Sequence, residues 1–268
     1  MATAALDLKQ PHEIKAPSAL LALTELPRAL MEWGSLAWSA GALLTTAPRG
    51  DGHPVLVLPG FMTSDTSTRV LRRFLRTLGY DAHTWNLGRN LGPRAIGESG
   101  EKLVERLREV HALTGQKVSI VGWSLGGIMA RLLARRAPDA VRQVITLGSP
   151  FAGSPKASNV WRLYEVMSGK RIDDKHTQGM MAEISARPSV PCTAIFSKAD
   201  GVVAWQSCRE VECDLAENIE VRGSHCGLGV NPSVLYAVAD RLARKPGEQR
   251  RFDRSGWRAM VYPATAHA

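Results

Sequence analysis

The sequence predicts an α/β fold, a mostly parallel sheet of about six strands covered by helices on both faces. The first observation is that short branched apolar runs alternate with longer segments of helical periodicity from residue 53 to about residue 244. Alternation at this spacing requires crossover connections between parallel strands. The second is that 268 residues, 44% hydrophobic and 22% charged, suit one soluble domain with a full core.

Residues 1–50 are expected to form a helical N-terminal segment with an apolar face, broken near Pro27. The apolar run 33–48 is too short for a membrane span and carries Ser, Thr and Gly. Its apolar face predicts either packing on the domain or contact of Trp33 and Trp38 with a lipid surface. A secretory signal is not evident, so we expect a cytoplasmic protein that can associate peripherally with a membrane.

Six segments of the chain are predicted to be strands, most of them buried on both faces. They cover residues 53–60, 81–88, 117–123, 141–150, 190–201 and 218–225. Four segments carry apolar residues at helical spacing, with glycine or proline near an end. These predicted helices cover residues 64–80, 96–115, 125–138 and 232–244. One domain over 51–244 therefore carries a mixed insert at 151–187, and the basic tail 245–268 is expected to be loosely held.

Charge and cysteine usage restrict the classes of partner. The net charge of +9 favours attraction to anionic surfaces, including anionic lipid. No basic run is interleaved with aromatic residues, so we expect no nucleic-acid partner. None of the four cysteines forms a C-x-x-C pair, and we expect no metal site. A disulfide between Cys208 and Cys226 stays open.

The motif Gly122-Trp123-Ser124-Leu125-Gly126 is G-x-S-x-G, and it lies where a predicted buried strand passes into a helix. So tight a turn strains the backbone of the serine, and glycines two positions to either side avoid collisions with the neighbouring strand and helix. The strain holds Ser124 Oγ at the carboxyl edge of the sheet, where the helix dipole favours developing negative charge. We therefore predict that Ser124 is a nucleophile.

A serine hydroxyl needs a base to take its proton and an acid to orient that base. Of the seven histidines, only His225 follows a late predicted strand in a glycine-rich loop that can bring its ring over the sheet edge. Asp200 leaves another predicted strand at its carboxyl end and lies between Ser124 and His225 in the chain. Ser124, Asp200 and His225 are thus the predicted catalytic residues.

Acyl transfer also needs donors for the oxyanion that forms. The Leu125 N–H directly follows the nucleophile, and the Phe61 N–H lies in the loop after the first predicted strand, with Met62 as its reserve. We expect Met62, Trp123 and Trp205 to bind substrate, because apolar side chains beside the site favour medium or long acyl groups.

The insert 151–187 is expected to lie over the sheet edge as a cap or lid. Its apolar side chains predict either an acyl pocket or packing of the insert onto the sheet. These are Trp161, Leu163, Tyr164, Val166, Met167, Met180 and Met181.

With these residues assembled, the chain resembles the α/β-hydrolase superfamily, and within it the bacterial triacylglycerol lipases and esterases and the GPI inositol-deacylases. The resemblance spans about 53–244 and rests on VLVLPGF, VGWSLGG, TLGSPFAG, SKADGVV and GSHCGLG. The chain order of serine, aspartate and histidine is that of the superfamily. The superfamily commonly begins with further strands, where this chain has its helical segment, so a reduced sheet of about six strands is expected.

The resemblance implies a serine carboxylester hydrolase that needs no cofactor and acts on acyl-ester or lipid substrates through an acyl-serine. Ser124 would be the nucleophile, His225 the base and then acid, Asp200 its orienting group, and Phe61 and Leu125 the oxyanion donors. Two alternatives stay open: an acyltransferase that uses the same acyl-serine, and a nonenzymatic binding module on the same fold.

Overall fold

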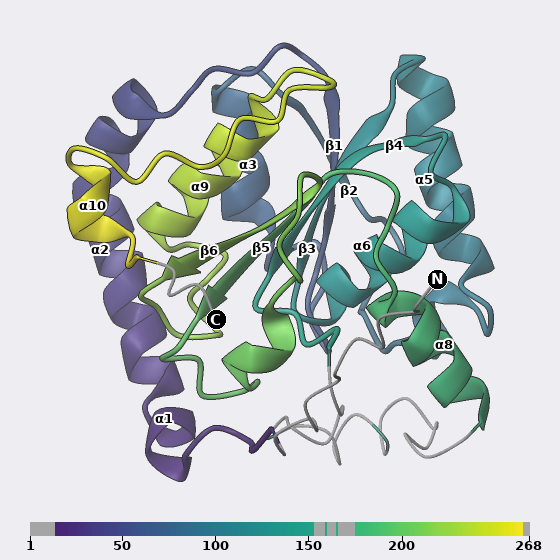
Figure 1. Ribbon diagram of the computed structural model, residues 1–268, viewed down its shortest axis with the longest axis horizontal. Helices are drawn as coiled ribbons and strands as arrows, with labels where there is room; N and C mark the ends of the chain where they lie inside the picture. The colour runs from purple at the N-terminus through teal and green to yellow at the C-terminus, as the bar shows by residue number, and fades with distance from the viewer. Residues whose placement is uncertain (1–13, 153–158, 160–164, 166–174, 265–268) are drawn as a thin grey trace, which may run out of the picture.

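A six-stranded sheet forms the centre of the protein, and its strands lie in the order β2-β1-β3-β4-β5-β6 (Figure 1). The computed structural model describes residues 14–152, 159, 165 and 175–264. Every neighbouring pair of strands is parallel. The strands are β1 (Pro54–Leu58), β2 (Asp81–Thr84), β3 (Val118–Trp123), β4 (Val141–Leu147), β5 (Cys192–Ser197) and β6 (Ala216–Val221). The predicted parallel sheet is confirmed.

Helices cover both faces of the sheet, as the sequence predicts (Figure 1). The first face carries α2 (Glu25–Thr46), α3 (Arg69–Thr77) and α9 (Pro232–Leu242), and the second carries α5 (Glu101–Thr114) and α6 (Leu125–Arg136). The shorter helices are α1 (Ala19–Leu23), α4 (Pro93–Ile96), α8 (Lys175–Ser185), the 3-10 helix η1 (Trp205–Cys208) and α10 (Arg258–Val261).

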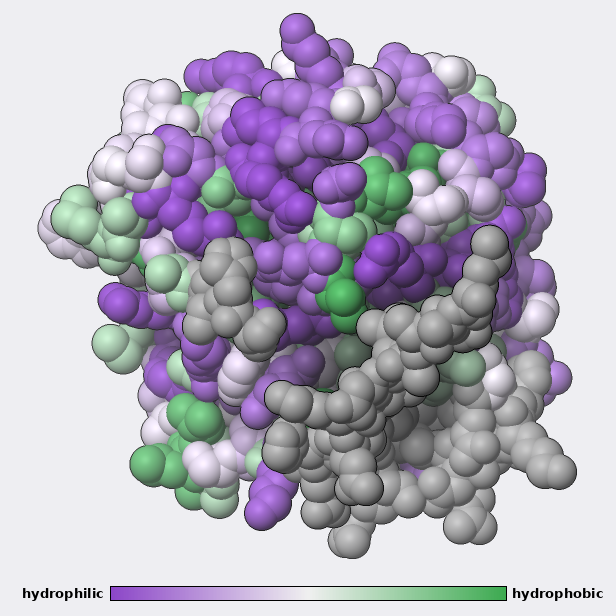
Figure 2. Space-filling view, in the orientation of Figure 1, coloured by the Kyte–Doolittle hydropathy of each residue, from purple (hydrophilic) through white to green (hydrophobic). Residues whose placement is uncertain are grey.

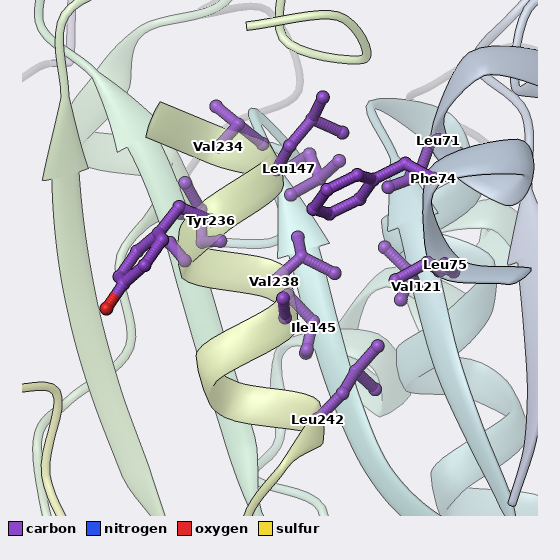
Figure 3. Close-up of a cluster of buried hydrophobic side chains, with 14 of the residues drawn as sticks. Leu71, Phe74, Leu75, Val121, Ile145, Leu147, Val234, Tyr236, Val238 and Leu242 are labelled. Carbon is purple, nitrogen blue, oxygen red and sulfur yellow. The ribbon is translucent and has the colours of Figure 1, made fainter. Parts of the chain in front are cut away.

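Two hydrophobic clusters lie on opposite faces of the sheet, because successive strand side chains alternate between the faces. In β1, Val55 and Val57 belong to the first cluster, whereas Leu56 belongs to the second. Figure 3 shows side chains of α3 and α9 meeting those of the strands in the first cluster. The labelled ones include Leu71, Phe74 and Leu75 of α3, Val121, Ile145 and Leu147 of the strands, and Val234, Val238 and Leu242 of α9.

The N-terminal segment is helical, but its break lies at Thr24 and not near Pro27. Pro27 is the third residue of α2. The first turn of a helix leaves its N–H groups without intrahelical partners, so a proline there removes no hydrogen bond. Thr24 instead ends α1 by donating its backbone N–H to the Leu20 carbonyl, and α2 begins directly after it.

The insert contributes α8, in which Met180 and Met181 pack around Phe151 and Ile184 against α6. This is the packing alternative for these two methionines. The other predicted pocket residues lie outside the described residues: Trp161, Leu163, Tyr164, Val166 and Met167.

The C-terminal tail differs from the loosely held segment that its composition predicts. The side chains of Phe252 and Tyr262 are buried, and both rings contact Tyr236 of α9. Two aromatic anchors therefore hold the described part of the tail, whose basic side chains form ion pairs and hydrogen bonds around them.

No helix within the described part of the chain is long and apolar enough to cross a membrane. All four cysteines lie in described residues and are free, with Cys208 buried and Cys226 exposed. The disulfide that the sequence leaves open between these two residues is thus not formed.

Candidate active site

Ser124 occupies a strained turn between β3 and α6. Its φ of 53° and ψ of −120° lie in a backbone region that few residues other than glycine adopt. A Cβ on Gly122 would lie 2.3 Å from the Gly126 carbonyl oxygen, and one on Gly126 would lie 2.4 Å from the Leu58 carbonyl oxygen. The predicted steric reason for glycine on both sides of Ser124 is therefore confirmed.

The backbone around Ser124 is anchored to the neighbouring strand. Its N–H donates to the Leu147 carbonyl at the end of β4 over 2.8 Å, and its carbonyl accepts the Gly127 N–H over 2.9 Å. Leu125 is the first residue of α6, a position at which the N–H has no acceptor within the helix. A half-buried serine and a helix N-terminus therefore lie together at the carboxyl edge of the sheet.

His225 and Asp200 form a buried hydrogen-bonded pair. His225 Nδ1 lies 2.6 Å from Asp200 Oδ2. The other oxygen of Asp200 accepts the N–H groups of Val202 and Val203, each over 2.8 Å, which fixes the carboxylate in its loop. Burial by itself lowers the pKa of His225, but the Asp200 carboxylate and then the more distant Glu25 carboxylate outweigh it, and the pKa is raised.

The loop that carries His225 meets the turn that carries Ser124. Trp123 Nε1, directly before the nucleophile, donates to the His225 carbonyl over 3.1 Å. A Cβ on Gly148, which follows β4, would lie 3.2 Å from both Asp200 Oδ2 and His225 Nδ1. Gly148 also follows Leu147, the acceptor of the Ser124 N–H. The three predicted catalytic residues therefore gather at one corner of the sheet.

The loop after β1 passes beside the nucleophile. A Cβ on Gly60 would lie 3.5 Å from Ser124 Cβ. The N–H of Met62 donates to the Asn90 carbonyl over 2.8 Å, so this N–H is already engaged. The Met62 N–H is therefore the less suitable of the two predicted oxyanion donors in this loop, and the role of the Phe61 N–H stays a prediction.

Two of the predicted substrate contacts, Trp123 and Trp205, take part in packing. The ring of Trp123 lies beside Gly229, where a Cβ would come within 3.2 Å of it. Trp205 stacks on Phe196 with ring centroids 5.7 Å apart and lies under the Lys198 ammonium group. A role of Met62, Trp123 and Trp205 in binding substrate stays a prediction.

Sequence reasoning missed two carboxylates of α2 that reach these loops. Glu25 accepts the backbone N–H groups of Gly201, His225 and Cys226, and Glu32 accepts that of Ser224. The sequence does contain a pattern that indicates them. Glu25 and Glu32 lie seven positions apart, and therefore on one face of a helix whose other residues are largely apolar.

No cluster of three or more His, Cys, Asp or Glu side chains within the described residues is placed to hold a metal ion.

Comparisons with known proteins agree with this architecture. A family model described as alpha/beta hydrolase fold matches residues 93–193. The chain is 28% identical to a triacylglycerol lipase of Burkholderia plantarii over 154 residues, which make up 55% of this chain and 43% of that protein. It is 30% identical to a triacylglycerol lipase of Pseudarthrobacter phenanthrenivorans over 115 residues, or 40% of this chain and 36% of that protein. The matched region thus spans less than half the length of either relative.

Solved structures show the same fold at low sequence identity. The crystal structure of Aspergillus fumigatus lipase B superposes with a TM-score of 0.58 at 18% identity, over 78% of this chain and 57% of that chain. That of Paleococcus ferrophilus monoacylglycerol lipase does so with a TM-score of 0.53 at 14% identity, over 72% of this chain and 96% of that chain. The chain is therefore an α/β-hydrolase fold protein related to bacterial triacylglycerol lipases and esterases.

Proposed function

We propose that the chain is a serine carboxylester hydrolase, an esterase or lipase that cleaves hydrophobic acyl esters through an acyl-serine. The observation that carries this proposal is the strained Ser124 at the β3–α6 turn, at the same sheet corner as the buried His225–Asp200 pair. Its relation to triacylglycerol lipases supports an ester as the substrate.

In the proposed acylation step, Ser124 Oγ attacks the ester carbonyl carbon and its proton passes to His225 Nε2. The N–H groups of Phe61 and Leu125 stabilise the resulting oxyanion. The bond to the alcohol oxygen then breaks, and His225 returns the proton to that oxygen as the alcohol leaves. A water molecule next attacks the acyl-serine and gives a proton to His225. The bond between the acyl carbon and Ser124 Oγ then breaks, His225 returns the proton to Oγ, and the carboxylic acid leaves. Asp200 keeps the imidazole oriented and stabilises its protonated form.

The test is hydrolysis of p-nitrophenyl esters from acetyl to palmitoyl by the full chain and by Ser124→Ala. We expect activity that Ser124→Ala removes, with a preference for chains longer than acetyl. Labelling of Ser124 by a fluorophosphonate tests the nucleophile independently of the ester chosen. A folded protein that hydrolyses none of these esters and is not labelled would overturn the proposal and favour the nonenzymatic alternative.

We also propose that α1 and α2 contact a membrane surface that presents the lipid substrate. Seven large apolar side chains of these helices are exposed, and Trp38 is 94% exposed. They are Leu20, Leu23, Leu26, Leu30, Met31, Trp33 and Trp38. Figure 2 shows hydrophobic residues gathered at the lower left of the molecule, where Figure 1 places α1. Exposed apolar surface of this kind on a chain with a net charge of +9 favours an anionic lipid surface.

Sedimentation with vesicles that contain anionic lipid tests this contact. We expect the full chain to pellet with the vesicles and the double variant with Trp33→Ala and Trp38→Ala to remain largely in solution. Leu113→Ala is the matched control, because Leu113 is exposed on α5, over the other face of the sheet. Equal sedimentation of the double variant and the full chain would contradict the proposed contact.

A further inference from the structure

Glu25, at the start of α2, is a buried carboxylate that accepts hydrogen bonds from several donors among the described residues. Its side chain belongs to a residue that is 4% exposed. Oε1 accepts the N–H of Gly201 over 2.7 Å, the N–H of His225 over 3.1 Å and an Arg28 guanidinium N–H over 2.9 Å. Oε2 accepts the N–H of Cys226 over 3.0 Å. Both oxygens thus act as acceptors only, which is the role of an ionised carboxylate.

These donors come from two different loops. Gly201 directly follows Asp200 in the loop after β5, whereas His225 and Cys226 lie in the loop after β6. The same side chain therefore sets the distance between the loop of the proposed acid and the loop of the proposed base. Arg28 strengthens the connection, because its Nη1 donates to the Ala199 carbonyl over 2.5 Å.

The loop after β5 leaves room for the N-terminal helices because it carries glycine at position 201, and the loop after β6 carries glycine beside Glu32. A Cβ on Gly201 would lie 2.3 Å from the Leu21 carbonyl oxygen. A Cβ on Gly227 would lie 2.3 Å from Glu32 Oε2. A side chain at Gly201 would meet the backbone of α1 and push it away from the site, whereas one at Gly227 would displace only the end of the Glu32 side chain. Close approach of the N-terminal helices is thus built into the loop after β5.

The charge of Glu25 also acts on His225. Among the described residues, the carboxylates of Asp200 and Glu25 act on His225. The Arg28 guanidinium pairs with Glu25, and the Cys226 thiol lies beside Glu25. Burial disfavours the imidazolium, while the two carboxylates favour it. The imidazolium forms when Ser124 transfers its proton, so a second carboxylate lowers the free energy of the charged state.

We propose that Glu25 is a positioning residue of the active site, whose carboxylate joins the Asp200 and His225 loops. This inference rests on the proposed function for its effect on catalysis, but its effect on His225 does not. It assigns the N-terminal helical segment a direct part in the active centre.

The test compares Glu25→Gln with Glu32→Gln in the full chain. The amide of Glu25→Gln keeps one acceptor oxygen, removes the charge, and places an NH2 group against the N–H donors. Glu32 is the matched control, because it lies on the same face of α2 and accepts the N–H of Ser224 over 2.6 Å, yet its side-chain hydrogen bonds within the described residues are to the segment after β6. The first readout is the pKa of the His225 ring, which an NMR titration measures in a Ser124→Ala background.

We expect Glu25→Gln to lower the pKa of His225 and Glu32→Gln to leave it at the value of the full chain. In active protein, we expect Glu25→Gln to reduce kcat roughly ten- to hundred-fold with little change in KM, as misplacement of reacting groups does. If Glu25→Gln does not fold, Glu25→Asp replaces it. The shorter side chain keeps the charge and loses the contacts, so kcat should fall while the pKa of His225 stays raised.

The outcomes separate this inference from the proposed function. An active protein in which Glu25→Gln and Glu32→Gln behave alike in both readouts would overturn the role of Glu25. A kcat and a His225 pKa that are both unchanged in Glu25→Asp would overturn it as well. A full chain without esterase activity that still shows the lowered pKa in Glu25→Gln would support the positioning of His225 and count against the esterase.

Discussion

The buried side chain of Asn90 donates from Nδ2 to the Pro59 carbonyl over 2.8 Å. Its backbone carbonyl also accepts the Met62 N–H, and its backbone N–H donates to the Thr63 carbonyl, each over 2.8 Å. One fully buried residue therefore holds the loop with the proposed oxyanion donor Phe61 at three points.

Asn90→Ala should reduce kcat roughly ten- to hundred-fold with little change in KM, because an oxyanion donor acts mainly in the transition state. It should also lower the free energy of unfolding by about 1–3 kcal/mol, since it leaves the Pro59 carbonyl buried without its donor. Ester kinetics and thermal unfolding measure the two effects. Gln116→Ala, which removes an exposed amide far along the chain, is the control and should change neither. An unaltered kcat in Asn90→Ala would show that the loop holds its shape without this side chain.

The raised pKa of His225 predicts the pH dependence of ester hydrolysis. Only the neutral imidazole can accept the Ser124 proton, so kcat/KM should rise with pH through the raised pKa and have its acid midpoint above the usual histidine value of about 6.5. A kcat/KM profile between pH 5 and pH 10 measures that midpoint. Burial has the largest effect on the pKa of His225 and lowers it, and the Asp200 carboxylate has the next largest effect and raises it. An NMR titration of Asp200→Asn should therefore give a lower pKa for the His225 ring. An acid midpoint below the usual histidine value would contradict the electrostatic account.

Gly148→Ala should separate the groups of the proposed active site. Gly148 has a φ of 52°, and its Cβ would lie 3.2 Å from the two hydrogen-bonded atoms of His225 and Asp200. We expect roughly a hundred-fold loss of kcat from the displaced pair, together with about 1–2 kcal/mol of backbone strain. Gly115→Ala is the matched control: its φ is 66° and nothing lies within 4 Å of its Cβ. The control should lose stability only, and equal kcat values for the two variants would refute the steric argument.

Arg241→Met should destabilise the protein without acting on the proposed site. The Arg241 guanidinium is fully buried, pairs with Glu217 over 2.5 Å, and donates to the Arg250 carbonyl of the C-terminal tail. Its removal leaves the Glu217 carboxylate without its closest buried partner, which costs about 3–5 kcal/mol of unfolding free energy. Glu109→Gln breaks the exposed pair with Arg106 and should cost less than about 1 kcal/mol. Chemical denaturation measures the free energy of unfolding of both variants. Similar losses of this free energy would show that the buried Arg241–Glu217 pair contributes no more to stability than the exposed pair.

The strands show how well the elements of the fold can be predicted from the sequence. The strand predicted over 190–201 is β5 at Cys192–Ser197, found because its apolar run is continuous. The strand predicted over 218–225 is β6 at Ala216–Val221, which begins earlier because Glu217 is part of it. A carboxylate resembles a loop residue in the sequence, but Glu217 is buried against Arg241 and Glu220 pairs with Lys198 over 2.8 Å. Such pairing joins residues far apart in the chain and leaves no local pattern.

Some residues of the proposed site can likewise be recognised in the sequence, and others cannot. Ser124 is recognisable because its glycines and its strand–turn–helix setting are consecutive in the chain, and His225 and Asp200 because each follows a strand. Asn90 does not stand out in the sequence, and the motif TLGSPFAG contains Gly148 without indicating which side chains it faces. Their roles depend on which loops lie against each other at the carboxyl edge of the sheet.

The alternation of strands and helices, the parallel sheet and the strained turn at Ser124 could be predicted from the sequence, because each follows from side-chain periodicity or from sterics within a few residues. The position of α2 against the loops after β5 and β6 became evident only in the folded protein. Glu25 meets Gly201 and His225 across 176 and 200 residues of chain, and the position of a helix relative to distant loops depends on the packing of the whole core.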